Sequence, residues 1–273
     1  MPELPEVETI ARNLRRTVIG KRIVRVRVSG MSLRRPVSPQ FAARLRNLTV
    51  SGVCRRGKYL VLSTHPHGYW LVHLGMSGRV FYNPPAGSAS LHTHAVIRFD
   101  DDSELHYRDH RRFGLLAVYS CPRLRDIPEL KSLGRDPLAR SFRPAWLHGL
   151  LCRSRQEIKS FLLDQRRIAG IGNIYACEAL FHARLHPARR CDTLSPGETE
   201  RLVRATQRVL RSAIRHRGTS FSDFMDANGH AGGHQRYLAV YQRQGKECAR
   251  CGSRIERIVH GNRSSFFCPQ CQR

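Results

Sequence analysis

Apolar residues in the first half of the chain recur with two different periods. Over residues 7–19 they lie three or four positions apart, which predicts an amphipathic helix ended by Gly20. Over residues 24–28 valines alternate with arginines, which predicts a half-buried strand, and a short helix is expected at 41–48. Further strand-like runs lie at Lys58–Ser63, Tyr69–His73, Ala95–Phe99, Glu104–Tyr107 and Leu115–Tyr119. Many short strands separated by turn residues predict a sandwich or a barrel.

After Gly134 the apolar spacing becomes helical. Residues 158–162 carry one apolar face and residues 174–181 carry another. The run Ser195-Pro196-Gly197-Glu198 has the form of a capping box with proline in the first turn, and it predicts the start of a long helix that Gly218 ends. A β-rich half followed by a helical half predicts an α+β fold.

The charge of the chain indicates its partner. It has 47 Lys and Arg against 21 Asp and Glu, a formal charge of +26 and a pI near 11.0. Such an excess is typical of proteins that bind polyanions. No segment has a basic face opposite a bulky apolar face, and no apolar run approaches 18 residues, so nucleic acid is favoured over a membrane. Nothing near residue 1 resembles a signal peptide, which predicts a cytosolic protein.

Four cysteines near the C-terminal end have the spacing of a zinc ribbon. They form two C-x2-C pairs separated by sixteen residues: Cys248, Cys251, Cys268 and Cys271. Four thiolates satisfy tetrahedral zinc and leave no open position for water, so we expect one structural zinc ion. A redox pair or a disulfide fits less well, because two pairs are present and cytosolic thiols stay reduced.

The N-terminal residues Pro2 and Glu3 predict a nucleophile. Removal of Met1 would leave a free proline amine, which attacks an aldehyde-like carbon to give an iminium ion. An α-amino group has a pKa near ~7.7–8.0, so a useful fraction is unprotonated at neutral pH. Glu3 and Glu6 are placed to move protons. The alternative is that proline and glutamate simply occupy the first turn of a helix.

Six motifs occur in order along the whole chain. They are Pro2-Glu3-Leu4-Pro5-Glu6, Arg56-Gly57-Lys58-Tyr59, His73-Leu74-Gly75-Met76-Ser77-Gly78, Arg111-Arg112-Phe113-Gly114, Ala169-Gly170-Ile171-Gly172-Asn173-Ile174-Tyr175 and the ribbon ending in Cys271-Gln272. With them the chain resembles the formamidopyrimidine-DNA glycosylase family of base-excision repair. The resemblance implies an N-terminal β-sandwich domain (1–134), a helix-two-turn-helix domain (135–236) and a zinc finger (237–273). It also implies a monomer in the bacterial cytosol that binds damaged duplex DNA between its halves.

The resemblance implies a catalytic role for Pro2 as nucleophile and for Glu3 as proton shuttle. Lys58 is expected at a phosphate near the damaged nucleotide, where it assists catalysis. Asn173 and Arg263 are expected on a phosphate beside the lesion. Lys159 is expected as a further phosphate or base contact. By itself, Lys58 is also compatible with an ordinary solvated lysine, and the glycine-rich motif that ends in Asn173 with an ordinary connection between two helices.

Met76, Arg111 and Phe113 match the residues that the family inserts into DNA when a base is extruded. An apolar wedge fills the hole, and arginine donates to the acceptors of the widowed cytosine. A lone methionine or a lone phenylalanine is more often part of a core. His110 departs from the family, which usually has proline before the two arginines, and this change is expected to loosen the turn.

The implied activity is that of a bifunctional glycosylase and AP lyase. It removes oxidised purines, 8-oxoguanine and formamidopyrimidines, through a proline Schiff base and β,δ-elimination. The glycine-rich stretch Gly218–His234 is expected to cover the flipped base, with its histidines as loop residues rather than ligands. Two alternatives remain: an endonuclease VIII-like glycosylase for oxidised pyrimidines, and a non-catalytic zinc-ribbon protein that only binds DNA.

Overall fold

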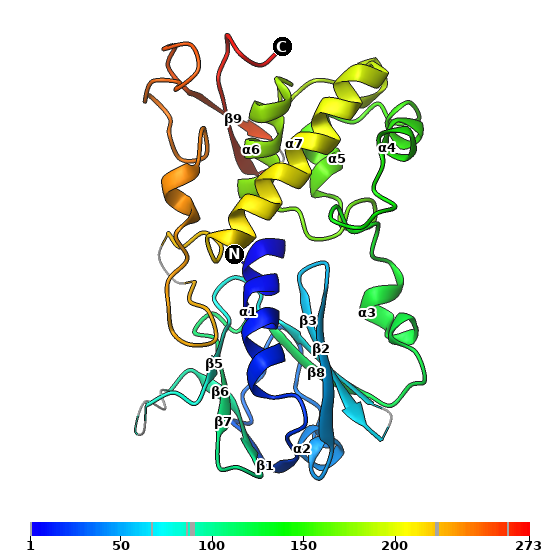
Figure 1. Cartoon of the computed structure of the whole chain (residues 1–273), viewed down its shortest axis with the longest axis vertical. Helices are drawn as coiled ribbons and strands as arrows, with labels where there is room; N and C mark the ends of the chain where they lie inside the picture. Colours follow the sequence, from blue (N-terminus) through cyan, green and yellow to red (C-terminus); the bar gives the residue numbers. More distant parts are fainter. Residues whose placement is uncertain (1, 67, 86, 88–90, 222–223, 261) are drawn as a thin grey trace. The chain divides into compact units, whose positions relative to one another are not determined.

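A computed structural model describes residues 2–66, 68–85, 87, 91–221, 224–260 and 262–273. Two compact units are present. The first comprises residues up to Lys131 together with His216–Gln235, and the second comprises Ser132–Arg215 with Arg236–Arg273 (Figure 1). Across the described residues, every helix is too short or too polar to cross a bilayer.

The first unit is a β-sandwich of two antiparallel sheets, each with four strands. One sheet has the order β1-β6-β7-β5, with β1 at Ile23–Val28, β6 at Thr93–Phe99, β7 at Glu104–Arg108 and β5 at Arg79–Tyr82. The other has the order β2-β3-β4-β8, with β2 at Thr49–Arg56, β3 at Tyr59–His65, β4 at Gly68–His73 and β8 at Leu115–Tyr119. The predicted strands are confirmed, and β2 and β5 are additional.

Helix α1 (Leu4–Thr17) supplies an apolar face to the core of this sandwich. Val7, Ile10 and Leu14 are fully buried in one cluster that contains residues of both sheets, including Trp70 of β4 and Phe99 of β6. The unit also contains α2 (Phe41–Leu45) and α3 (Pro128–Lys131). Because α1 is fixed by this core, its N-terminal end has a defined place next to the segment 216–235.

The second unit is helical. It contains α4 (Pro144–Leu151), α5 (Ile158–Leu163), α6 (Asn173–Ala183) and α7 (Pro196–Arg215), and α7 packs against α4 and α6. Short 3-10 turns lie at Leu124–Asp126 in the first unit, at Cys191–Thr193 in the second, and at His234–Tyr237, where the chain passes from the first unit to the second.

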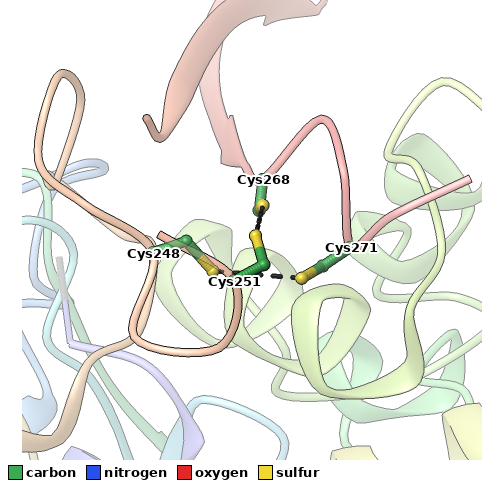
Figure 2. A group of neighbouring side chains, drawn as sticks. All are labelled: Cys248, Cys251, Cys268 and Cys271. Carbon is green, nitrogen blue, oxygen red and sulfur yellow. Dashed lines mark hydrogen bonds between the residues drawn. The ribbon is translucent and has the colours of Figure 1, made fainter. Parts of the chain in front are cut away.

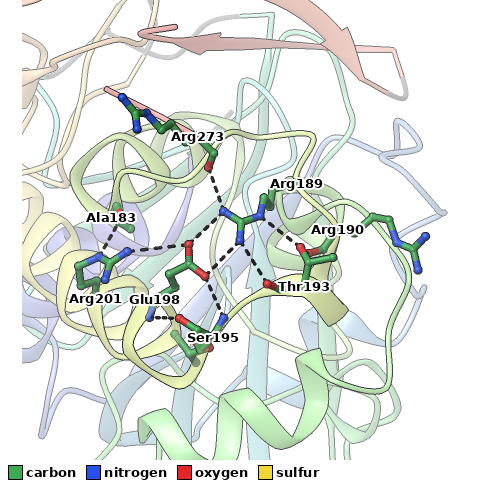
Figure 3. A network of polar contacts seen from close by, with 9 residues as sticks. Ala183, Arg189, Arg190, Thr193, Ser195, Glu198, Arg201 and Arg273 are labelled. Atoms are coloured by element: carbon green, nitrogen blue, oxygen red, sulfur yellow. Dashed lines mark hydrogen bonds and ion pairs between the residues drawn. The ribbon is translucent and has the colours of Figure 1, made fainter. Parts of the chain in front are cut away.

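The predicted capping box at the start of α7 is present. The Ser195 amide donates to Glu198 Oε2 at 2.8 Å, and the Glu198 amide donates to Ser195 Oγ at 3.2 Å. Arg189 adds a two-pronged ion pair to the same carboxylate, with nitrogen–oxygen distances of 3.0 and 3.2 Å (Figure 3). The helix ends at Arg215, three residues before the predicted stop at Gly218. Glu198 therefore fixes both the start of α7 and the loop that precedes it.

A zinc-ribbon hairpin completes the second unit. Strands β9 (Glu256–His260) and β10 (Arg263–Phe267) pair antiparallel, and β10 packs on α6. Glu178 of α6 is 1% exposed and accepts three backbone N–H groups, from Ala239, Val240 and Tyr241, at 2.8 to 2.9 Å. This buried carboxylate fastens the chain that leads into the ribbon, and burial raises its pKa.

The expected fold class is confirmed: a β-sandwich with flanking helices, a helical C-terminal region and a four-cysteine hairpin. The segment 216–235 groups with the sandwich, and the ribbon groups with the helices. The division into three domains at residues 134 and 236 stays a prediction.

Candidate functional site

The N-terminal end of α1 is buried and held by a carboxylate. Pro2 is buried, and Glu3, the N-cap residue, is 2% exposed. Glu6 Oε2 accepts the backbone N–H of Glu3 at 2.8 Å, and Glu6 Oε1 accepts the backbone N–H of Thr219 at 2.8 Å. Both oxygens of Glu6 are thus engaged in positioning the terminus, so Glu3 is the better candidate for proton transfer. Met1, whose removal is expected, lies outside the described residues.

Lys58 occupies the two-residue turn between β2 and β3. Gly57 precedes it with φ +56°, and Arg56 pairs with Tyr59, an arrangement typical of a type II′ hairpin that requires glycine first. The Arg55 guanidinium donates to the Gly57 carbonyl at 3.1 Å and to Glu8 of α1 at 3.2 Å. The turn that carries Lys58 is therefore tied to the helix that begins beside Pro2.

His73 lies at the end of β4, where the positive charge of Lys58 acts on its imidazole. Burial, and then the positive charges of Lys58 and Arg34, lower the pKa of His73 to about 4. Its Nδ1 accepts the backbone N–H of Gly75 at 3.0 Å. The imidazole is therefore neutral at physiological pH, and it fixes the first bond of the turn that follows.

That turn presents Met76 to solvent. Gly78 donates its backbone N–H to the Leu74 carbonyl at 2.7 Å, and a Cβ at Gly78 would lie only 2.3 Å from the same oxygen. Gly75 has φ +60°, and a Cβ there would lie 2.4 Å from the carbonyl carbon of Phe113. Both glycines are required by close backbone packing. As a result Met76, a large apolar residue, is 41% exposed.

Arg111 and Phe113 lie on a second exposed turn. The Arg111 guanidinium lies over the Phe113 ring at 5.0 Å, and Phe113 is 47% exposed. Between them Arg112 has φ +58°, a left-handed conformation that places its two neighbours on a tight bend. The Arg112 amide still donates to the Asp109 carbonyl at 3.2 Å, so the turn is closed although His110 replaces proline.

Asp109 joins the two turns, and nothing in the local sequence pattern singles it out. The residue has no exposed surface. Ser77 Oγ donates to Asp109 Oδ1 at 2.5 Å, and the Gly114 amide donates to Asp109 Oδ2 at 2.8 Å. Ser77 follows Met76, and Gly114 follows Phe113. One buried carboxylate therefore holds the backbone on either side of the three expected wedge residues.

In the second unit, the glycine-rich turn leads into α6 with Gly172 as N-cap and Asn173 as first residue. Gln165 holds this turn: its Oε1 accepts the Gly170 amide at 2.7 Å and its Nε2 donates to the Ile171 carbonyl at 2.8 Å. Helix α6 is eleven residues long, and the backbone N–H groups at the N-terminus of such a helix can donate to a phosphate. Gln165 is a supporting residue that the motif alone does not indicate.

Asn173 and Lys159 converge on the strand that begins with Arg263. Asn173 Nδ2 donates to the Ser264 carbonyl at 3.0 Å, and Lys159 Nζ donates to the same oxygen at 2.8 Å and to Ser265 Oγ at 2.6 Å. Arg263 is exposed, whereas Lys159 is 1% exposed. The burial of Lys159 favours a role in placing Arg263 over direct contact with DNA.

The four cysteines meet at one point. Their sulfur atoms all lie within 4.8 Å of one another, with Cys251 and Cys268 at 3.4 Å and Cys248 and Cys271 at 4.0 Å (Figure 2). Zinc–sulfur bonds of about 2.3 Å at tetrahedral angles put sulfur atoms about 3.8 Å apart. The set therefore fits one zinc ion with four protein ligands and no position for substrate.

The surroundings of the cysteines suit a structural metal. Gly252 has φ +78° in the first knuckle and donates to the Cys248 carbonyl at 2.9 Å. In the second knuckle, Gln272 accepts the Cys268 amide at 2.9 Å and donates to the Leu185 carbonyl at 2.8 Å. Gln272 is 2% exposed, so the last knuckle is anchored to the helical unit from inside.

The expected residues fall into two groups. The sandwich unit carries Pro2, Glu3, Lys58, Met76, Arg111 and Phe113, and the helical unit carries Lys159, Asn173, Arg263 and the cysteines. The described part of the loop Gly218–His234 belongs to the sandwich unit; residues 222–223 lie outside the described residues. Each unit therefore contributes its own set of candidate residues.

Three family models match the chain. They are the formamidopyrimidine-DNA glycosylase N-terminal domain over residues 1–116, the formamidopyrimidine-DNA glycosylase H2TH domain over 133–225, and the zinc finger found in FPG and IleRS over 245–273. Together they span most of the sequence and occur in the order of the two units and the ribbon.

Individual proteins are similar over the full length. A formamidopyrimidine-DNA glycosylase of Pelotomaculum thermopropionicum is 42% identical, with 100% of this chain and 99% of that protein covered. The crystal structure of a Lactococcus lactis Fpg mutant with DNA containing Fapy-dG matches with a TM-score of 0.92, 31% identity and full coverage of both chains. The MutM (Fpg) structure from Thermus thermophilus matches with a TM-score of 0.89 and 38% identity, covering 99% of this chain and 98% of that one.

Proposed function

The chain belongs to the formamidopyrimidine-DNA glycosylase family, and we propose that it excises oxidised purines from duplex DNA and then cleaves the strand as an AP lyase. The observation that carries the proposal is the end of α1, where Pro2 and Glu3 are buried side by side and fixed by Glu6. The start of an ordinary helix needs no such enclosure, whereas a nucleophile and its proton carrier must be held in a fixed position.

The first step joins protein and DNA. With Met1 removed, the Pro2 nitrogen attacks C1′ of the damaged nucleotide, and the C1′–N9 bond breaks as the base leaves with the electron pair and takes up a proton. Glu3 moves a proton to O4′ as the sugar ring opens, which leaves a C1′ iminium ion on Pro2. The positive iminium nitrogen then acts as the electron sink for the next steps.

Two eliminations follow from the iminium ion. Loss of the C2′ proton expels the 3′ phosphate, and a second elimination expels the 5′ phosphate. The strand is left with a one-nucleotide gap flanked by phosphates, and hydrolysis of the iminium releases Pro2 and the sugar fragment. In each elimination the electrons of the broken C–H bond, at C2′ and then at C4′, form a C=C bond, and the phosphate leaves with the electrons of its C–O bond, so no redox partner is needed.

DNA is gripped and distorted by both units in this proposal. Lys58 binds a phosphate near the lesion, and Asn173 and Arg263 bind a neighbouring one. Met76, Arg111 and Phe113 fill the space left by the extruded base, and Arg111 donates to the opposite cytosine. The excess of positive charge supplies sequence-independent affinity.

Zinc stabilises the ribbon that carries Arg263 when it binds the four cysteines. Lys159 donates to the Ser264 carbonyl and so orients Arg263, the residue before Ser264. We assign Lys159 this positioning role in place of a phosphate contact. The protein acts as a monomer in the cytoplasm in this proposal.

The formamidopyrimidine branch is favoured over the endonuclease VIII branch. The exposed Met76, Arg111 and Phe113 form a complete wedge set, and the Lactococcus lactis relative was crystallised with a Fapy-dG lesion. Oxidised purines opposite cytosine, 8-oxoguanine among them, are therefore the proposed substrates.

Borohydride trapping tests this function directly. Intact mass should show that the purified protein starts at Pro2, and borohydride should trap it on duplex DNA that contains 8-oxoguanine. Pro2→Gly should lose base excision by a factor of about 100 or more while duplex affinity stays within about twofold. Glu3→Gln should bind the lesion and stall before strand cleavage. Retained Met1 together with full excision, or undiminished trapping by Pro2→Gly, would rule out the proline nucleophile.

A further inference from the structure

We propose that Asp109 is a positioning residue that couples the two wedge-bearing turns, so that Met76, Arg111 and Phe113 enter DNA as one rigid unit. This inference rests on the proposed function, because it assigns a role to residues that support the wedge. Asp109 itself has no exposed surface and cannot reach DNA in this conformation.

The carboxylate of Asp109 is buried, and hydrogen bonds engage both of its oxygens. Burying an ionised carboxyl group is costly unless hydrogen bonds compensate it. Within the described part of the chain, three hydrogen bonds hold this carboxylate: from Ser77 Oγ at 2.5 Å, the Gly114 amide at 2.8 Å and the Tyr107 hydroxyl at 3.3 Å. The role of such a buried acid therefore lies in the groups that its two oxygens bind.

The two oxygens bind different turns. Oδ1 accepts from Ser77, and Ser77 Oγ in turn accepts the Arg111 amide at 3.2 Å. Oδ2 accepts the Gly114 amide, directly after Phe113. A chain of bonds therefore runs from the Met76 turn through Asp109 to both ends of the Arg111–Phe113 turn.

The backbone of Asp109 reinforces the same coupling. Its carbonyl accepts the Arg112 amide at 3.2 Å and His94 Nε2 at 2.9 Å, which ties the turn to β6 of the sheet. Close packing of Gly75 against Phe113 brings the two turns into backbone contact. The left-handed backbone of Arg112 is strained. The turn therefore needs these contacts to keep the Arg111 side chain in a fixed orientation.

Loss of the coupling between the two turns should impair insertion of Met76, Arg111 and Phe113 into DNA and leave the reaction of the Pro2 amine unchanged. Excision of 8-oxoguanine from duplex DNA requires the wedge. Strand cleavage at an abasic site in single-stranded DNA requires the Pro2 amine and does not require a wedge. The ratio of these two activities therefore separates a positioning role from a general effect on folding.

The experiment compares Asp109→Ala and Asp109→Asn with wild type. Asp109→Ala removes both acceptors and should reduce duplex excision opposite cytosine about tenfold or more, with less than about twofold change on single-stranded abasic DNA. Preference for cytosine over the other opposing bases should fall as it does in Arg111→Ala. Asp109→Asn keeps one acceptor and should give an intermediate loss. In the double variant with Arg111→Ala, Asp109→Ala should reduce the cytosine preference little further.

Two further variants keep the outcome decisive. Ser77→Ala removes the hydroxyl that bonds both Asp109 and the Arg111 amide, and it leaves the Gly114 link intact. It should lower duplex excision by a few-fold, which tests the proposal if Asp109→Ala does not fold. Tyr107→Phe removes the third bond to the same carboxylate and leaves the bonds from Ser77 and Gly114 in place, so it should keep the cytosine preference. Unchanged preference in Asp109→Ala, or in Ser77→Ala if Asp109→Ala does not fold, would overturn the positioning role. Failure of wild type to excise 8-oxoguanine would instead overturn the proposed function.

Discussion

The sandwich unit and the helical unit hold exposed functional side chains in different ways. In the sandwich, which has a large apolar core from two sheets and α1, two buried carboxylates, Glu6 and Asp109, each accept backbone N–H groups next to candidate residues. In the zinc ribbon, Arg263 starts a two-stranded hairpin whose small apolar cluster contains two of the metal-binding cysteines, Cys248 and Cys268.

The difference follows from the size of each core. A large core compensates the cost of ordering the chain and can also enclose polar groups whose hydrogen bonds are complete. A two-stranded hairpin buries too little apolar surface for that, so a metal must supply the missing free energy. We therefore expect the position of Arg263 to depend on zinc and the positions of Met76, Arg111 and Phe113 to be independent of it.

Loss of zinc should produce the largest difference between the units. Structural zinc sites contribute roughly 10–16 kcal/mol of apparent binding free energy in small modules. Cys268→Ser should release the one zinc ion per chain and weaken DNA binding, because the Arg263 strand loses its order. Cleavage of single-stranded abasic DNA should change less, because the Pro2 end lies in the sandwich unit.

Cys152→Ser is the matched control, since Cys152 is an exposed cysteine of the same unit outside the cluster. Zinc content is measured by metal analysis and duplex affinity by titration. A metal-free Cys268→Ser protein with wild-type affinity for duplex DNA would show that zinc does not place Arg263.

Acid should weaken the sandwich unit through His73. Its pKa is about 4 in the folded protein and ~6.5 when unfolded, so the unfolded state binds a proton first as the pH falls. The resulting loss of stability begins near pH 6.5 and continues down to about 4. For this one group it amounts to about 2 kcal/mol between pH 7.5 and 5.0.

Urea unfolding at the two pH values measures the effect. Trp70 lies in the sandwich and Trp146 in the helical unit, so a Trp146→Phe background makes fluorescence report the sandwich. His73→Asn retains an acceptor for the Gly75 amide and should reduce the pH dependence. An unchanged pH dependence in His73→Asn would exclude His73 as its source.

The wedge residue Arg111 should affect discrimination between bases opposite the lesion rather than overall affinity for duplex DNA. Arg111→Ala should spare binding to undamaged duplex and reduce the preference for cytosine opposite the lesion by roughly 1–3 kcal/mol. Excision rates against each of the four opposing bases measure it. If wild type shows no such preference, or if Arg111→Ala keeps it in full, Arg111 does not read the widowed base, and the turn at His110 becomes the first place to examine.

The smallest effect is expected from Arg263. Arg263→Ala should weaken lesion-containing and undamaged duplex alike and lower the salt dependence by about one ion. Arg254, an exposed arginine of the same ribbon that donates to the Gly245 carbonyl, is the matched control and should change the slope less. An equal loss for both variants would mean that the ribbon contributes general charge and no specific phosphate contact.

Features that depend on neighbouring residues were predictable from the sequence. The α7 capping box and the cysteine spacing are local patterns, and each is present. Strand β2 was not predicted because a bulge between Val50 and Gly52 breaks its alternation. Strand β5 was missed because four residues are too few to show a period.

Features that depend on distant residues were not predictable. Asp109 reads as a loop acid, Glu178 as a surface residue of a helix, and Lys159 as a basic side chain that faces solvent. Each is buried because a partner far along the chain completes its hydrogen bonds: Ser77, the segment 239–241 and Ser264. The family resemblance supplied candidate contact residues, but it did not supply the buried groups that hold them.

The discontinuous composition of the sandwich unit has a consequence for protein synthesis. The sheets are complete at Lys131, but the Thr219 amide that binds Glu6 belongs to the segment His216–Gln235. A ribosome that adds about 5–20 residues per second needs roughly 5–20 s to go from residue 131 to residue 235. Throughout that interval the α1 terminus of the nascent chain lacks its Thr219 bond. Completion of the end of α1 that carries Pro2 and Glu3 therefore waits until the helices α4 to α7 of the second unit have been synthesised.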